Sequence, residues 1–255
     1  MISAFTMEWQ KLLPLHRTSR TMGVAVALAV VVSAVVAAAM AAHGSHMTAS
    51  DRLGFDSMGV SLQGVNAAVL AVGVFGVLTV TREYGSGMIR TTFMAHPSRL
   101  RVLAAKLATH AAVAGVAAVV ACLAAFAAGQ AVLGTGGLSD TWGDPRLPSA
   151  LGGAVVYLLL ICAWGVGLGA LLRSTSSAIT WLASLLVVAP VIVQILPQST
   201  VDLVGRWLPS QIGQQAITAN PSPHAFAEWN GLAVLGAYAA LTLLAGAWRM
   251  ARSDP

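Results

Sequence analysis

Six stretches of about twenty residues without a charged side chain constrain this chain more than any other feature. They lie near residues 22–42, 58–81, 107–128, 150–172, 177–196 and 231–248. A helix needs about 20 mostly apolar residues to cross a bilayer, and a charge at its centre costs about 2.5–3.5 kcal/mol. Runs such as residues 26–42 do not alternate between polar and apolar residues, which favours helices over a membrane β-barrel. The sequence therefore predicts an all-α polytopic membrane protein with six transmembrane helices.

The distribution of basic residues predicts how these helices are oriented. If the N-terminus is cytoplasmic, eleven of the fourteen Lys and Arg residues fall in cytoplasmic segments and three in outer loops. The cytoplasmic ones are Lys11, Arg17, Arg20, Arg82, Arg90, Arg99, Arg101, Lys106, Arg173, Arg249 and Arg252, and the outer ones are Arg52, Arg146 and Arg206. This excess predicts cytoplasmic N- and C-termini in a plasma (inner) membrane. Topology and anionic inner-leaflet lipid account for the net charge of +5, so no nucleic acid is expected as a partner.

The N-terminal segment, residues 1–20, has the pattern of a helix that lies on the membrane surface. Apolar residues recur every three to four positions, with Glu8 and Lys11 on other faces, until Pro14 interrupts the pattern. Trp9 is expected at the level of the lipid headgroups. The segment either anchors the first span or contacts a partner subunit. Residues 21–255 then form the six-span domain.

The loop between the second and third spans is basic and contains glycine at close spacing. Residues 82–106 hold five of the fourteen Lys and Arg residues. Gly85 and Gly87 permit a sharp chain reversal, and the apolar residues that follow can form a short helix before Pro97. This inner segment, 82–101, is suited to transmitting force from a cytoplasmic partner. An ordinary basic loop that only sets orientation is the alternative.

Polar and irregular features elsewhere predict further details. Gln63 and Asn66 are expected on one face of the second span, where they either join helices or line a pathway, as does Gln194 in the fifth. Pro190 should kink the fifth span. The small-residue pair Gly165 and Gly169 predicts close packing, within the chain or across a dimer. Loops are expected at residues 130–149, and apolar residues between prolines at 197–229 predict short re-entrant helices that cap or brace the outer mouth.

Motifs for enzymatic chemistry are not found in the sequence. Neither Lys11 nor Lys106 follows a glycine, so the chain has no phosphate-binding P-loop, and it contains no HExxH or CxxC motif. His43 and His46 could ligate a metal but lack a third ligand at a known spacing. We therefore assign no catalytic residue, no metal and no bound cofactor. An ion-coupled secondary transporter would need an embedded carboxylate or an inverted repeat, and the spans show neither.

Three motifs in order along the chain carry a family resemblance. They are Glu8-Trp9-x-Lys11-Leu12, the string REYGSGMIRTT at residues 82–92, and Pro97-Ser98-Arg99 followed by Lys106. With six spans, this pattern resembles the permease subunit of type-2 ATP-binding-cassette exporters over essentially the whole chain. The resemblance implies a cytoplasmic coupling helix that docks on an ATPase subunit, with the N-terminal connecting helix beside it. The coupling residues would be Glu83, Tyr84, Gly85, Gly87, Met88, Ile89, Arg90, Thr91 and Thr92, and those on the connecting helix Glu8, Trp9 and Lys11.

The resemblance also implies a function. The chain would be a permease that forms the translocation pathway as a homo- or heterodimer, while a separate ABC ATPase binds ATP and Mg. Since no charge lies within the spans, an amphiphilic drug, lipid or peptide is the expected cargo. The alternative is a membrane scaffold or sensor that binds a cytoplasmic partner without transport.

Overall fold

The computed structural model describes residues 15–86, 88, 99–139, 143–218 and 226–252. Within these ranges every regular element is a helix, and six helical segments are long and apolar enough to cross a membrane. They are Arg20–His43, Ser57–Gly85, Arg101–Thr135, Leu147–Leu172, Thr175–Gln194 and Trp229–Arg252. The prediction of an all-α protein with six transmembrane helices is confirmed.

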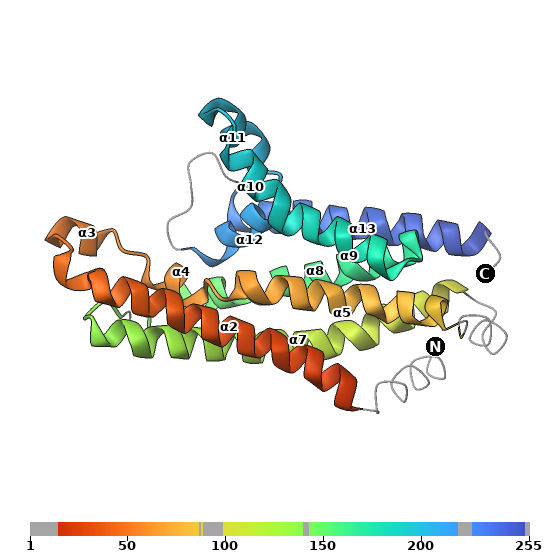
Figure 1. The fold of residues 1–255 in the computed structure, drawn as a ribbon, viewed down its shortest axis with the longest axis horizontal. Coiled ribbons are helices and arrows are strands. Elements are labelled where there is room, and N and C mark those ends of the chain that lie inside the picture. Colours follow the sequence, from red (N-terminus) through yellow and green to blue (C-terminus); the bar gives the residue numbers. More distant parts are fainter. Residues whose placement is uncertain (1–14, 87, 89–98, 140–142, 219–225, 253–255) are drawn as a thin grey trace.

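The long helices run side by side in one bundle (Figure 1). They are α2 (Leu15–His43), α5 (Val65–Gly85), α7 (Arg99–Thr135), α8 (Leu147–Leu172) and α13 (Glu228–Arg252). The start of α2, the end of α5, the start of α7 and the end of α13 all lie at one end of the bundle. We call it the basic end, because it carries Arg82, Arg101, Lys106, Arg173, Arg249 and Arg252. We call the opposite end the loop end; it carries α3 (Ala49–Leu53), α4 (Ser57–Leu62), α11 (Gln198–Gly205) and α12 (Pro209–Ile217).

The second span consists of two helices rather than one. Helix α4 ends at Leu62 and α5 begins at Val65. Between them, hydrogen bonds that span three residues, such as Gln63 N–H to the Val60 carbonyl, replace α-helical bonds that span four. A Cβ at Gly64 would lie 1.9 Å from the Ala29 carbonyl oxygen of α2, so only glycine permits this close approach. Gln63 lies in this break and Asn66 in the first turn of α5, and the two residues line different cavities.

Glycines hold α8 against its neighbours. A Cβ at Gly165 would lie 2.3 Å from the Gly73 carbonyl oxygen of α5, and one at Gly76 would lie equally close to the Cys162 carbonyl oxygen. Gly167 faces α13 in the same way, where a Cβ would lie 2.4 Å from the Thr242 hydroxyl oxygen. These glycines, which we call the small-residue seam, pack helices of one chain against each other. Packing within the chain is one of the two possibilities that the sequence left open.

The third span extends further than its uncharged stretch. Helix α7 continues to Thr135 and α8 begins at Leu147, so the expectation of a loop throughout residues 130–149 was wrong at both ends. Gln130 is buried, and its side-chain amide donates to the Ser61 hydroxyl (3.0 Å) and the Ser57 carbonyl (3.3 Å). These bonds satisfy a polar side chain that would otherwise favour a loop, and they let the helix continue.

The fifth span changes helix type before its proline. It comprises α9 (Thr175–Ala183), the π-helical segment Ser184–Val188 and α10 (Ala189–Gln194). The Ala189 N–H donates to the Ser184 carbonyl, five residues back. Pro190 follows directly and has no N–H to donate, and a π-helical turn is one way in which a helix adjusts to such a residue.

Two short helices follow the fifth span at the loop end. Helix α11 projects from the bundle, whereas α12 lies against α13 and α8 (Figure 1). Helix α12 buries Ile212, Gly213, Ala216 and Ile217. Short helices between the fifth and sixth spans are therefore present as predicted, and their entry into the membrane stays a prediction.

Candidate functional site

The predicted coupling residues are described only in part. Glu83, Tyr84 and Gly85 form the last turn of α5, and Met88 is exposed just beyond it. Residues 82–85 of the predicted inner segment 82–101 therefore belong to α5, and residues 99–101 belong to α7. Outside the described residues lie Gly87, Ile89, Arg90, Thr91, Thr92 and the connecting-helix residues Glu8, Trp9 and Lys11.

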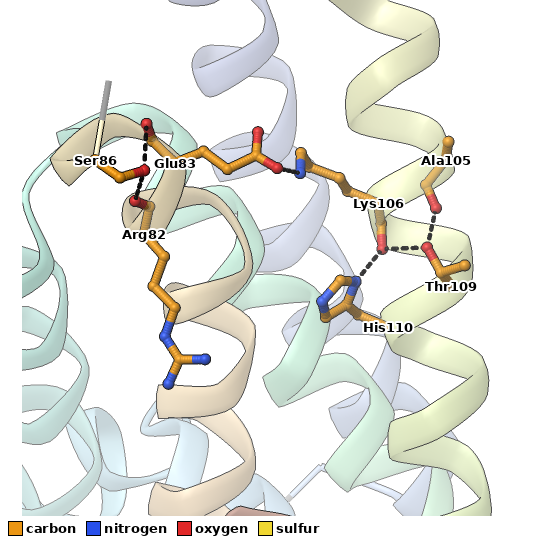
Figure 2. Close-up of polar contacts among 7 residues, drawn as sticks. All are labelled: Arg82, Glu83, Ser86, Ala105, Lys106, Thr109 and His110. Carbon is orange, nitrogen blue, oxygen red and sulfur yellow. Dashed lines mark hydrogen bonds and ion pairs between the residues drawn. The ribbon is translucent and has the colours of Figure 1, made fainter. Parts of the chain in front are cut away.

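A buried ion pair joins the two helices that lead into and out of this segment. The Lys106 ammonium of α7 donates to the Glu83 carboxylate of α5 at 2.6 Å, and the two side chains are only 1% and 11% exposed. Figure 2 shows these groups reaching toward each other while Arg82 points away from the pair. Each charged side chain can be buried at the end of its helix because the opposite charge of the other offsets the loss of hydration. Glu83 is among the predicted coupling residues and Lys106 is not, although opposite charges at the borders of consecutive spans are a usable signal in the sequence.

Hydrogen bonds within each helix surround the ion pair (Figure 2), and a ring contact joins the same two helices nearby. The His110 Nδ1 lies 2.9 Å from the Lys106 carbonyl oxygen, and the His110 ring packs 5.3 Å from the Phe75 ring of α5. The Thr109 hydroxyl donates to the Ala105 carbonyl, and that of Ser86 to the Arg82 carbonyl at 2.9 Å. Helix α5 therefore contacts α7 both at the ion pair and further along the bundle.

Two arginines connect the other helices at the basic end. Arg173 follows α8 with a φ of 54°, and its guanidinium lies 5.2 Å from the centre of the Tyr84 ring. Arg173 also donates to the Arg249 carbonyl (3.0 Å), and Arg249 donates to the Leu171 carbonyl (2.5 Å). The ends of α5, α8 and α13 are thus connected through side chains, so a displacement of one is opposed by the others.

A cavity of about 170 Å³ lies nearer the loop end, between α5, the fifth span and α12. Neutral polar residues from these helices and from α8 line it: Asn66, Gln194, Ser210, Gln211, Gln214 and Tyr157. We call it the amide cavity. The structure brings the predicted residues Asn66 and Gln194 together here, from positions far apart in the sequence.

A second, more open cavity of about 500 Å³ is lined by residues of α2, α4 and α12 and by the predicted residue Gln63. Gln214 of α12 lines both cavities, so the two adjoin at this residue. At the second cavity, the Asp56 carboxylate accepts from the Gly59 N–H (2.8 Å) and lies at hydrogen-bonding distance from the Thr218 hydroxyl. These bonds connect α4 with the end of α12.

Comparison with known proteins decides the family. The model of the family described as ABC-2 family transporter protein matches residues 46–248, which is most of the chain. The chain belongs to the ABC-2 transporter family. A search of curated proteins found no match. With its six apolar helices, this ABC-2 permease is a multi-pass membrane protein, and its family implies an ABC ATPase subunit as partner. The resemblance that the sequence motifs carry is confirmed.

Helix α12 of the permease is held in place by a close contact that can be tested. A Cβ at Gly213 would lie 2.1 Å from the Tyr157 ring of α8, so Gly213→Ala should displace α12 and destabilise the permease by about 1–3 kcal/mol. Gly205→Ala is the matched control, because a Cβ there has open space. Thermal unfolding of the purified permease measures both effects. Equal stability of the two variants would show that α12 does not pack on Tyr157 in this way.

Proposed function

We propose that this ABC-2 permease forms an export pathway as a dimer with a second permease subunit. A separate ABC ATPase, which binds ATP and Mg, supplies the energy, and this chain binds no cofactor. The family match carries this proposal, because an ABC-2 permease is the membrane component of such a transporter. Homodimer and heterodimer remain two forms of the same proposal.

The mechanism that we propose transmits ATPase movement through the inner segment 82–101. The ATPase contacts this segment and the N-terminal residues Glu8, Trp9 and Lys11, which precede α2. Displacement of the segment pulls on α5 and α7 together, since Glu83 and Lys106 join them at its base. The contacts of Arg173 and Arg249 pass the movement to α8 and α13. The helices then tilt between two packed arrangements, as in other rigid-body switches.

In this mechanism Glu83 is a positioning residue. Its carboxylate is buried against Lys106 and not displayed on the surface. The exposed Met88 and the residues up to Thr92 are then the ones that contact the ATPase. Arg90 is the charged member of that group, and a cation is well suited to an acidic groove of the partner.

The basic residues and the apolar spans bear on orientation and cargo. The basic end faces the cytoplasm of a plasma (inner) membrane, because the excess of basic residues lies there. The cargo is an amphiphilic drug, lipid or peptide, since the spans provide apolar surface and few charges. Helices α11 and α12 cap the outer mouth.

Charge reversal in the inner segment tests the docking role. Arg90→Glu should weaken binding of the ATPase about tenfold or more, which corresponds to about 1.4 kcal/mol. Arg146→Glu is the charge-reversal control at the loop end; it removes the ion pair of Arg146 with Asp144 but should leave ATPase binding unchanged. Copurification of the ATPase with each permease variant and its cargo-stimulated turnover measure the effect. Normal copurification and turnover with Arg90→Glu would refute the docking role, whereas docking without any vesicle transport would favour a scaffold.

A further inference from the structure

The amide cavity contains polar atoms that lack partners. The Asn66 Nδ2 and the Ser210 Oγ are buried, and neither makes a hydrogen bond to any part of the chain that the structure describes. They come from α5 and α12, which face each other across the cavity. A buried donor without a partner costs about 1–3 kcal/mol, so such groups are commonly satisfied by water or a ligand.

The lining of the amide cavity is neutral. Four side-chain amides, one serine and one tyrosine supply its polar atoms, and none of the described residues that line it carries a charge. Each amide offers both a donor and an acceptor. A charged ligand would lose part of its hydration in this partly open cavity without meeting a counter-ion, whereas a neutral group would exchange water for amide hydrogen bonds.

The size of the cavity limits what can bind. An engineered protein cavity of about 150 Å³ holds one benzene molecule. The amide cavity, at about 170 Å³, therefore has room for one six-membered ring with a small substituent. Apolar side chains of Val69, Leu70 and Leu186 complete the wall and can pack against the faces of such a ring.

We propose that the amide cavity binds a neutral, hydrogen-bonding group of single-ring size and rejects charged groups of the same size. Asn66 and Ser210 provide the unpaired polar atoms, and Gln194, Gln211 and Gln214 complete the recognition. In an exporter this group is the polar part of the cargo, and this role, unlike the binding itself, rests on the proposed function. Gln214 also lines the second cavity, which places it on the way from one cavity to the other.

Thiol labelling of Leu70→Cys in the full-length permease in lipid nanodiscs tests the site, because Leu70 lines the amide cavity without supplying any of its polar atoms. The neutral reagent methyl methanethiosulfonate is used, and three ring compounds of equal size serve as probes: benzamide, benzoate and benzylammonium. Benzamide should slow labelling saturably, about fivefold at four times its dissociation constant, because occlusion scales as 1 + [L]/Kd. Benzoate and benzylammonium should give no protection. Equal protection by all three probes, or by none, would overturn the proposal.

Three variants serve as controls for this experiment. Ser139→Cys is an exposed thiol at the loop end, whose labelling benzamide should not change. Asn66→Leu in the Leu70→Cys chain should abolish the protection, and Gln211→Leu is the second choice if that chain does not fold. Asn230→Leu makes the same change on an exposed face of α13 and should leave protection intact. Loss of protection in both asparagine variants would contradict the site. Neither outcome depends on ATPase docking, so this test and the Arg90→Glu test fail independently.

Discussion

Lys106→Met is expected to lower the free energy of unfolding of the permease by about 3–5 kcal/mol. The substitution removes one partner of a buried ion pair and leaves the Glu83 carboxylate, whose side chain is 11% exposed, without its 2.6 Å contact. An isolated charge in such a site is costly because it has lost most of its hydration. Unfolding of the purified permease in mixed micelles by a denaturing detergent measures the loss.

A double variant separates the ion pair from simple loss of packing. Glu83→Gln combined with Lys106→Met removes both charges, so it should recover most of the stability that Lys106→Met loses. The same contact changes what Glu83→Lys would report. The sequence alone predicts that Glu83→Lys leaves expression intact and uncouples ATP hydrolysis. In the structure it places two ammonium groups together in a buried site, so it should reduce expression. A stable Lys106→Met permease would contradict the structural role of the pair.

Gly165→Ala is expected to have the second largest effect, a loss of about 1–3 kcal/mol or more. The added Cβ would lie 2.3 Å from the Gly73 carbonyl oxygen, and this atom belongs to the backbone of α5, which moves only if the two helices separate. Since α5 carries Glu83 and α8 precedes Arg173, their separation should also disturb the basic end. Thermal unfolding and ATPase stimulation measure the two consequences.

Gly152 provides the matched control on the same helix. A Cβ at Gly152 meets no atom within 4 Å, so Gly152→Ala should leave stability unchanged or raise it by up to about 1 kcal/mol. If both alanine variants behave alike, the close packing of α5 on α8 is wrong. If only Gly165→Ala is destabilised, the small-residue seam within one chain is supported.

The six spans could be predicted because the exclusion of charge from a membrane helix is a strong local signal. The ends of the helices were harder to predict from the sequence, because they depend on contacts between residues that are distant along the chain. A search for uncharged windows stops before Glu83 and starts after Lys106, whereas the two charges neutralise each other and both helices continue. Likewise, the break between α4 and α5 depends on the approach of Gly64 to Ala29, which no local pattern in the sequence shows.

Some residues of the candidate sites could likewise be predicted from the sequence, and others could not. Asn66 and Gln194 stood out in the sequence because amides are rare within spans, and the structure places both in the amide cavity. Ser210, Gln211 and Gln214 were missed, because they lie in a segment that reads as an outer connection and reach the cavity only through the packing of α12. Their spacing beside buried Ile212 was the available signal for an amphipathic helix.

Cross-linking from Met88 shows directly whether the inner segment docks on an ATPase subunit in the cytoplasm. Met88 is 49% exposed and lies just beyond α5, so a photoreactive group attached to Met88→Cys samples whatever the inner segment touches in membranes that contain the whole transporter. We expect a cross-link from Met88→Cys to an ATP-binding subunit. We expect no such cross-link from the same photoreactive group attached to Gly143→Cys at the loop end. Two results would contradict docking of the inner segment on a cytoplasmic ATPase. One is labelling of Met88→Cys by an impermeant thiol reagent added outside intact cells. The other is a set of cross-links that never includes an ATP-binding protein.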